Sequence, residues 1–271
     1  MTVAVRRHAS PALALRQTGA LAWRSAITTI RIPQAWFPSL FFPLVLLAIF
    51  TGSFGNAPGN IPGFPPVRGF LDFAIAGSIL QGVLIAGTSA GAAFAADIEH
   101  GFFDRLVASP VSRPAILIGR LGASVLQGIF QGMLFLALAV IFGARVETGV
   151  AGVFVLIVFA ALLGAAWGSL GVILALRTGS SEAVQGAFPL FFVLLFFSSA
   201  FFPRETMTGW YKQIADVNPI SYVVEGMRAE VIGHEDLTKT LLGLAIAAGL
   251  ALLGVTVATL AYRRRLATEG A

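Results

Sequence analysis

The chain has 271 residues, of which 57% are hydrophobic and only 11% are charged, and its formal net charge is +5. A soluble globular domain carries about 25% charged residues to wet its surface, so this composition excludes a water-soluble protein. The absence of cysteine and the isolation of the three histidines exclude a disulfide framework and favour no metal site. Basic residues lie at the ends of apolar runs, which is typical of membrane helices and not of nucleic-acid-binding proteins.

An amphipathic segment precedes the first apolar run. Ser10 followed by Pro11 predicts a helix start, since serine caps helices and proline favours their first turn. A basic amphipathic helix that carries a tryptophan lies in the membrane interface. We therefore expect a cytoplasmic N-terminus and an interfacial helix over residues 1–34, with an ordinary solvated helix as the alternative. The apolar side of this helix comprises Leu15, Trp23, Ala26, Ile27 and Ile30.

Six apolar segments follow, and each is long enough to cross a bilayer, which requires about 20 apolar residues. We expect an all-α transmembrane domain over residues 35–262, followed by a cytoplasmic tail over residues 263–271. Arginines are more frequent in the connections on one side of these segments, which places both termini in the cytoplasm. The predicted spans are 35–54, 71–96, 115–142, 149–176, 183–202 and 241–262.

Two connections between the spans are long enough to form structures of their own. The predicted cytoplasmic connection, residues 97–114, is charged and contains a proline-bearing turn. The predicted external connection, residues 203–240, reads as two short helices over residues 207–217 and 219–231. We expect them to be separated at Asn218, because the residue before a proline disfavours the helical conformation.

Uncharged polar residues form stripes along the second and third spans. In a membrane helix, such stripes face protein or a wet cavity and not lipid. Two interpretations stay open, namely hydrogen bonds between helices and the lining of a substrate path. Pairs such as Gly87 and Gly91 also have the spacing that allows helices to approach closely. The polar stripes comprise Ser78, Gln81 and Ser89 on the second span and Ser124, Gln127 and Gln131 on the third.

The chain carries no convincing enzymatic motif. Ser89 lies in a G-x-S-x-G pattern, but that pattern falls within an apolar segment and the histidines lie outside the spans, so a serine hydrolase lacks its base. Residues 233–240 miss the P-loop pattern, because Thr238 stands where the second glycine belongs. Asp72 lies at the edge of a span, and the absence of a carboxylate deep in any span disfavours a proton-driven carrier.

The cytoplasmic connection contains Glu99-x-Gly101, then Asp104-Arg105-Leu106, and then Ser109-Pro110-x-Ser-Arg113. In this order of motifs it resembles the coupling-helix region of type-two ABC exporter permeases. That family has a Glu-x-Gly pattern, a short helix with an acid-Arg-Leu core, and then Ser-Pro-x-Ser-Arg. The run from Gly101 to Leu106 most resembles the daunorubicin-resistance-like branch. A second likeness is Asn-Pro-x-x-Tyr with a later arginine in the external connection, although relatives often have proline before Trp210. The residues that carry both likenesses are Glu99, Gly101, Phe102, Phe103, Asp104, Arg105, Leu106, Ser109, Pro110, Trp210, Asn218, Pro219, Tyr222 and Arg228.

This resemblance implies a permease subunit in a bacterial inner membrane that exports a hydrophobic or amphipathic molecule, such as a drug or a lipid-linked glycan. It implies a second permease, expected to be a copy of the same chain, and two separate ATP-binding subunits that hold ATP and Mg. The coupling helix would dock on those subunits through three apolar anchors, Phe102, Phe103 and Leu106, and through polar contacts from Glu99, Asp104 and Arg105. An ion-coupled or stand-alone transporter is the alternative, and an intramembrane enzyme is less favoured.

Overall fold

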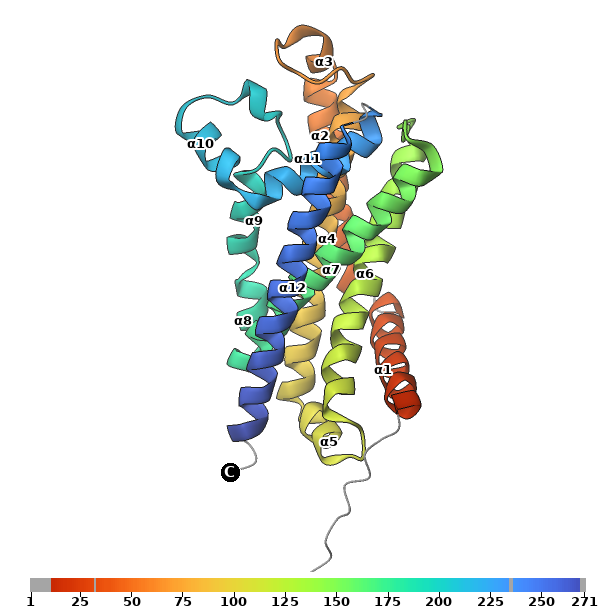
Figure 1. Cartoon of the computed structure of the whole chain (residues 1–271), viewed down its shortest axis with the longest axis vertical. Coiled ribbons are helices and arrows are strands. Elements are labelled where there is room, and N and C mark those ends of the chain that lie inside the picture. The colour runs from red at the N-terminus through yellow and green to blue at the C-terminus, as the bar shows by residue number, and fades with distance from the viewer. Residues whose placement is uncertain (1–10, 32, 234–235, 269–271) are drawn as a thin grey trace, which may run out of the picture.

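The computed structural model describes residues 11–31, 33–233 and 236–268, and the regular structure within these ranges is helical. Within these ranges, five long helices run side by side along the longest axis of the molecule (Figure 1). All five are long and apolar enough to cross a membrane, which confirms an all-α integral membrane protein. They coincide with the first four and the last of the expected spans, and they are α2 (Pro33–Phe54), α4 (Phe70–Glu99), α6 (Arg113–Ile141), α7 (Gly149–Thr178) and α12 (Leu237–Thr268).

The expected fifth span is not one continuous helix. It is divided into α8 (Ser181–Gly186) and α9 (Phe188–Phe196), after which the chain turns through residues 197–202. Pro189 lies in the first turn of α9, where backbone N–H groups have no partner within the helix, so the N–H that proline lacks is not needed. Proline at this position favours the start of a new helix over the continuation of α8. The two short helices follow one another along the bundle (Figure 1). The segment expected to form the fifth span therefore contains two short helices.

Helix α4 lies at the centre of the bundle. In its most apolar 18 residues, 83% are buried within the chain, compared with 6% for the span that contains most of α2. Glycines allow this close packing, because a Cβ added to Gly91 would lie 2.4 Å from the Cα of Gly171 on α7. Gly128 on α6 similarly faces Gly164 on α7. The small-residue spacing seen in the sequence thus joins helices of the same chain.

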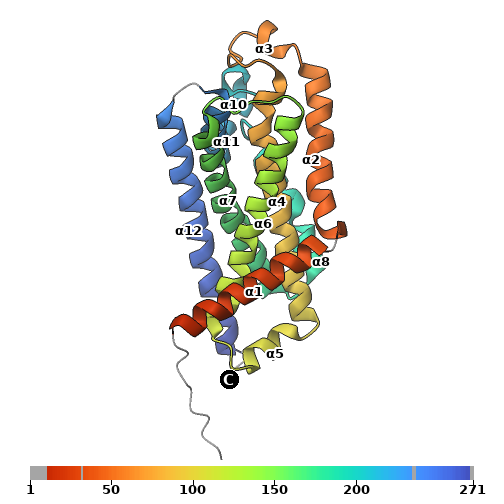
Figure 2. The same ribbon diagram turned by 90° about the vertical axis from the view of Figure 1, so that its right-hand side faces the viewer.

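Short helices cover the two ends of the bundle. At one end lie α5 (Phe102–Ala108) and α1 (Pro11–Arg31), together with the C-terminal part of α12, and we call it the α5 end (Figure 2). The opposite end is called the α10 end (Figure 1). The expected break at Asn218 is confirmed. The α10 end comprises α3 (Ala57–Asn60), η1 (Arg204–Thr206), α10 (Gly209–Val217) and α11 (Pro219–Ile232).

Helix α1 crosses α6 at a steep angle (Figure 2). A Cβ added to Gly119 of α6 would lie 2.8 Å from Cβ of Leu21, so the absence of a side chain at this glycine permits the contact. Trp23 is 65% exposed, and Ile27 is half-buried. The side chains of three further members of the predicted apolar face, together with the first ten residues and Ile32, lie outside the described part of the chain. Those members are Leu15, Ala26 and Ile30.

Candidate functional site

The candidate site is built around α5, which links the ends of α4 and α6. Gly101 has a φ of 66° in the left-handed region, which glycine adopts without strain, and it turns the chain out of α4. Arg105 Nε donates to the Gly101 carbonyl at 3.3 Å, and Ser109 Oγ donates to the Leu106 carbonyl at 2.7 Å, where α5 ends. Both ends of this short helix are therefore held by side chains.

Phe103 fixes α5 to the bundle. Its side chain is 0% exposed, and its ring centroid lies 5.6 Å from that of Phe94 on α4 and 6.1 Å from that of Tyr262 on α12. The guanidinium of Arg265 lies 5.5 Å from the centroid of the same ring. Phe103 therefore attaches α5 to the bundle, and its own chain covers the ring completely. The sequence did not indicate that Tyr262 and Arg265 belong to this site.

Phe102 joins α5 to α1. The Arg24 guanidinium of α1 lies 4.4 Å from the centroid of the half-buried Phe102 ring, and that of Arg105 lies 5.8 Å from it. Such cation–π contacts contribute about 0.5–1 kcal/mol at exposed sites. Beyond α5, the backbone N–H of Ser112 donates to Gln17 Oε1 of α1 at 3.3 Å. Helix α5 therefore contacts α1 as well as the bundle.

The outward surface of α5 combines charge with apolar area. Asp104, Arg105 and Pro110 are exposed, and Leu106 is half-buried beside them. Glu99 is also exposed, but its Oε1 accepts a hydrogen bond from the Ser181 backbone N–H at 2.8 Å. Glu99 thus holds the start of α8, so part of its hydrogen-bonding capacity serves its own chain. This surface can be recognised by a protein partner.

An ion pair between Asp97 of α4 and Arg120 of α6 joins the two helices that flank α5. The Arg120 guanidinium also lies 5.1 Å from the centroid of the Phe94 ring. Opposite charges near the same end of two neighbouring predicted spans were the signal in the sequence for this pair. The pair keeps the flanks of α5 in register.

The polar stripes turn out to lie largely inside the chain. Ser78, Gln81, Ser124, Gln127 and Gln131 are each at most 9% exposed, whereas Ser89 is half-buried. Ser78 Oγ donates to the Ala74 carbonyl, and Ser124 Oγ donates to the Arg120 carbonyl. Gln131 Nε2 donates to the Ser39 carbonyl of α2.

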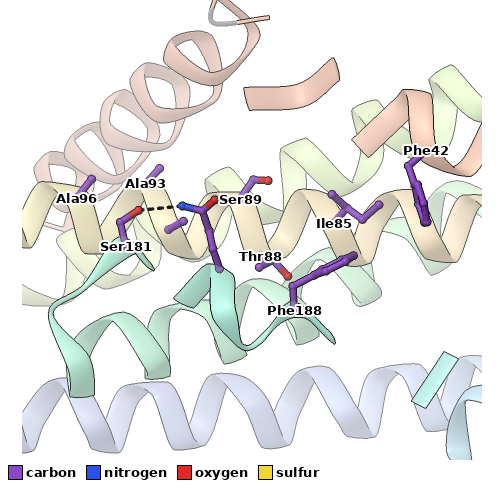
Figure 3. Close-up of a pocket in the computed structure, with 10 residues that line it drawn as sticks. Phe42, Ile85, Thr88, Ser89, Ala93, Ala96, Ser181 and Phe188 are labelled. Atoms are coloured by element: carbon purple, nitrogen blue, oxygen red, sulfur yellow. Dashed lines mark hydrogen bonds between the residues drawn. The ribbon is translucent and has the colours of Figure 1, made fainter. Parts of the chain in front are cut away.

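A cavity of about 570 Å³ opens beside Ser89, between α2, α4 and the pair α8 and α9. Apolar side chains provide most of its walls, and Figure 3 shows Thr88 and Ser89 on α4 with Phe188 near them. Gln185 Nε2 donates to Ser181 Oγ at 3.4 Å on the opposite wall. The lining residues are Phe42, Ile85, Thr88, Ser89, Ala92, Ala93, Ala96, Ser181, Gln185 and Phe188.

At the α10 end, Asn218 connects α9 to α11. Its Oδ1 accepts from the Ile220 backbone N–H at 2.9 Å, and its Nδ2 donates to the Leu194 and Phe197 carbonyls at 2.7 and 2.9 Å. One side chain therefore caps the start of α11 and the end of α9. Pro219 directly follows it as the first residue of α11. The sequence predicted the break here but not the link to α9.

Arg228 binds three backbone carbonyls although it is only 5% exposed. Its Nε donates to Phe73 at 3.1 Å, and its Nη2 donates to Ser199 at 2.8 Å and Ala200 at 3.3 Å. The guanidinium also lies 3.6 Å from the centroid of the Phe73 ring. Burial lowers the pKa of Arg228 to about 9, which still leaves the side chain charged at neutral pH. Arg228 ties α11 to α4 and to the turn after α9.

The outer face of α10 and α11 carries aromatic and charged side chains. Trp210 is 66% exposed, and Tyr222 Oη donates to the Asp216 carbonyl at 2.6 Å. The Arg204 guanidinium lies 4.4 Å from the centroid of the Tyr222 ring, and its Nε donates to Glu225 Oε1 at 2.6 Å. Burial lowers the pKa of Arg204, but hydrogen bonding and the charge of Glu225 outweigh this effect and raise it overall.

Comparisons with known proteins agree with this architecture. A family model described as ABC-2 type transporter matches residues 16–231. The chain is 29% identical over 248 residues to the daunorubicin resistance ABC transporter permease protein DrrB1 of Streptomyces coeruleorubidus, covering 90% of this chain and 84% of that protein. It is 28% identical over 217 residues to the putative transport permease ycf38 of Porphyra purpurea, covering 79% and 73%.

A further relative is the inner membrane transport permease YadH of Escherichia coli K12, which is 25% identical over 214 residues and covers 76% of this chain and 80% of that protein. The expected resemblance to type-two permeases and to drug-resistance relatives is confirmed. The chain belongs to the ABC-2 type transporter family and is a multi-pass membrane subunit of an ABC transporter.

Proposed function

We propose that this chain is the permease subunit of an ATP-driven exporter. Two separate ATP-binding subunits dock on α5 and hold ATP and Mg, while two copies of this chain form the path for the substrate. The observation that carries the proposal is the position of α5, a short helix whose buried face is fixed to the bundle and whose opposite face is charged and exposed. That arrangement suits a docking element.

The contacts of α5 provide a route for force. Phe103 packs on Phe94 of α4 and on Tyr262 of α12, and Tyr262 Oη donates to the Arg113 carbonyl at the start of α6 at 3.0 Å. A partner that pushes on Asp104 or Arg105 therefore displaces three long helices together. Closely packed side chains transmit such a displacement, because protein interiors are dense and barely compressible.

The substrate is hydrophobic or amphipathic. The cavity beside Ser89 is large enough for a small organic molecule, and its walls are mainly apolar with a few hydroxyl and amide groups. Such a lining binds an apolar body and orients a polar substituent. Of the residues expected along a substrate path, we assign only Ser89 to the path and the others to helix packing.

The α5 end faces the cytoplasm, and transport proceeds toward the α10 end. Arginines support this orientation, since Arg105 lies on α5, Arg113 starts α6 directly after it, and the last turns of α12 contain three further arginines at residues 263–265, all at the same end. The start of α1 and the end of α12 also lie at that end, which supports two cytoplasmic termini. Exposed Trp210 suits the outer membrane interface at the opposite end.

A charge-reversal experiment tests this function. The complex with the ATP-binding subunit is reconstituted in liposomes, and uptake of a fluorescent amphipathic drug is measured with ATP on the side of α5. Arg105→Glu should abolish copurification of the ATP-binding subunit and ATP-dependent transport, while the matched variant Arg145→Glu at the α10 end should retain both. Transport driven by an ion gradient without the ATP-binding subunit would contradict the proposal in favour of an ion-coupled carrier.

A further inference from the structure

A hydrogen bond joins α6 to α2 at a proline. Pro43 lies inside α2, four residues after Ser39. Since proline has no N–H, it cannot donate to the Ser39 carbonyl as the residue at that position does in a regular α-helix. Gln131 Nε2 of α6 donates to that carbonyl at 2.9 Å. The Gln131 side chain thus supplies the donor that Pro43 lacks, and we call this bond the α2 latch.

The α2 latch is shielded from solvent. Ser39 and Gln131 are each 1% exposed. Inside a bilayer, a backbone carbonyl without a donor is costly, and a side chain of a neighbouring helix is one of the few groups that can satisfy it. Gly82 of α4 makes room for this side chain, because an added Cβ would lie 3.0 Å from Gln131 Cγ. Three helices therefore shape the site of the latch.

The latch matters because α2 is otherwise weakly held. The span that contains most of α2 is only 6% buried in its most apolar 18 residues. Among the α2 side chains that the structure describes, the buried ones are Ser39, Pro43 and Leu47, which form a single line at intervals of four residues. The latch lies at one end of this narrow inward face. Its hydrogen bond adds a directional contact from α6 to the apolar contacts of this face.

Phe42 links the latch to the cavity. It directly precedes Pro43, and its side chain lines the cavity beside Ser89 (Figure 3). Its ring centroid also lies 5.7 Å from that of Phe192 on α9. The rotation of α2 about its own axis and its position along the bundle therefore set the separation of the cavity walls.

We propose that Gln131 is a positioning residue for transport, which holds α2 as a wall of the cavity through its hydrogen bond to the Ser39 carbonyl. Gln131 acts on the substrate only through α2. The inference rests on the proposed function in that the cavity must receive the transported molecule. The latch itself can be tested without transport.

A double-mutant cycle isolates the hydrogen bond. In the full complex, Gln131→Leu keeps the volume of the side chain and removes the donor, whereas Pro43→Ala gives α2 back its own donor for the Ser39 carbonyl. Gln131→Leu should lower transport per ATP hydrolysed by roughly three- to twenty-fold, the range of hydrogen bonds between membrane helices. In the Pro43→Ala background, the same substitution should have little effect. An equal loss in both backgrounds, or no loss in either, contradicts the proposal.

A thiol-labelling measurement reports directly on the position of α2. Because the natural chain has no cysteine, Phe42→Cys provides a single reporter on the cavity wall. Gln131→Leu should raise the labelling rate of this thiol by roughly three- to twenty-fold. The additional substitution Pro43→Ala should suppress that increase. Thr256→Val, which removes a hydroxyl bonded within α12 at 2.7 Å, is the control and should leave the rate unchanged.

The two readouts separate the latch from the proposed function. If the unmodified complex fails to transport while labelling responds as expected, the proposed function fails and the latch stands. If Gln131→Leu reduces transport without changing the labelling rate, Gln131 does not act through α2. Should the Gln131→Leu chain fail to accumulate, its recovery in the Pro43→Ala background supports the latch, and its continued absence there contradicts it.

Discussion

At the residue scale, Phe102 and Phe103 have different roles because neighbouring residues of a helix point about 100° apart. Phe103 points into the bundle and is 0% exposed, whereas Phe102 lies at the surface between Arg24 and Arg105. One ring therefore attaches α5, and the other lies at the edge of the docking surface. A partner would meet Phe102, Leu106 and the charged residues between them.

Replacement of these two residues should separate stability from docking. Phe103→Ala should lower the free energy of unfolding by about 3–5 kcal/mol, since it empties a fully enclosed site. Phe102→Ala is the matched control, and it should cost less because its ring is only half-buried. Thermal unfolding of the detergent-purified chain measures both effects. Equal losses of stability would contradict the different burial of the two rings.

Arg228 permits a second test at this scale. Arg228→Met retains much of the chain length but leaves the Phe73, Ser199 and Ala200 carbonyls without this donor, so the free energy of unfolding should fall by about 3 kcal/mol. Arg145→Met removes an exposed arginine from the same end of the bundle and should change stability by about 0.5 kcal/mol or less. Equal melting temperatures for the two variants would contradict a structural role of the buried guanidinium.

At the scale of the elements, close packing of α4 against α7 sets the core of the bundle. Gly91 and Gly171 approach each other so closely that a single added carbon would collide with backbone. Backbone cannot move aside as the end of a flexible side chain can. Glycine at these two positions is therefore required by the packing of the helices and not by the conformation of the chain.

Two alanine substitutions test this packing. Gly91→Ala should destabilise the chain by about 1–3 kcal/mol through overpacking. Gly249→Ala on α12 is the control, because its added Cβ meets nothing within 4 Å, and higher helix propensity should leave stability equal or slightly raised. Thermal unfolding compares the two variants. A Gly91→Ala chain as stable as the parent would show that α4 and α7 can separate without cost.

The sequence predicted the long helices well, because 20 or more consecutive apolar residues leave few alternatives. It did not indicate the division of residues 183–202, where mean hydropathy favours one span and Pro189 starts a second short helix. The break at Asn218 was predictable from Pro219, which acts locally. Which face of α5 is buried was not, since a seven-residue helix contains too few turns to define an apolar side and its packing partners come from α4 and α12.

At the scale of the whole molecule, the two ends of the bundle differ in their chemistry. The α5 end presents a charged helix that is bound to α1, α4 and α12, whereas the α10 end is tied together by Asn218 and Arg228. Between them lies an apolar bundle, which has a cavity of about 570 Å³ on its side. An ATP-binding subunit that acts at the α5 end would therefore move the long helices, while the elements at the α10 end stay joined to one another.

Cross-linking in the assembled complex tests most directly whether α5 docks the ATP-binding subunit. Since the natural chain has no cysteine, Asp104→Cys places one thiol on the exposed face of α5, and Arg145→Cys places one at the α10 end. Each variant is coexpressed with the ATP-binding subunit, and a short thiol-to-amine reagent is added to membranes. We predict a cross-linked heterodimer for Asp104→Cys alone. No cross-link from Asp104→Cys, or an equal one from Arg145→Cys, would contradict docking at α5.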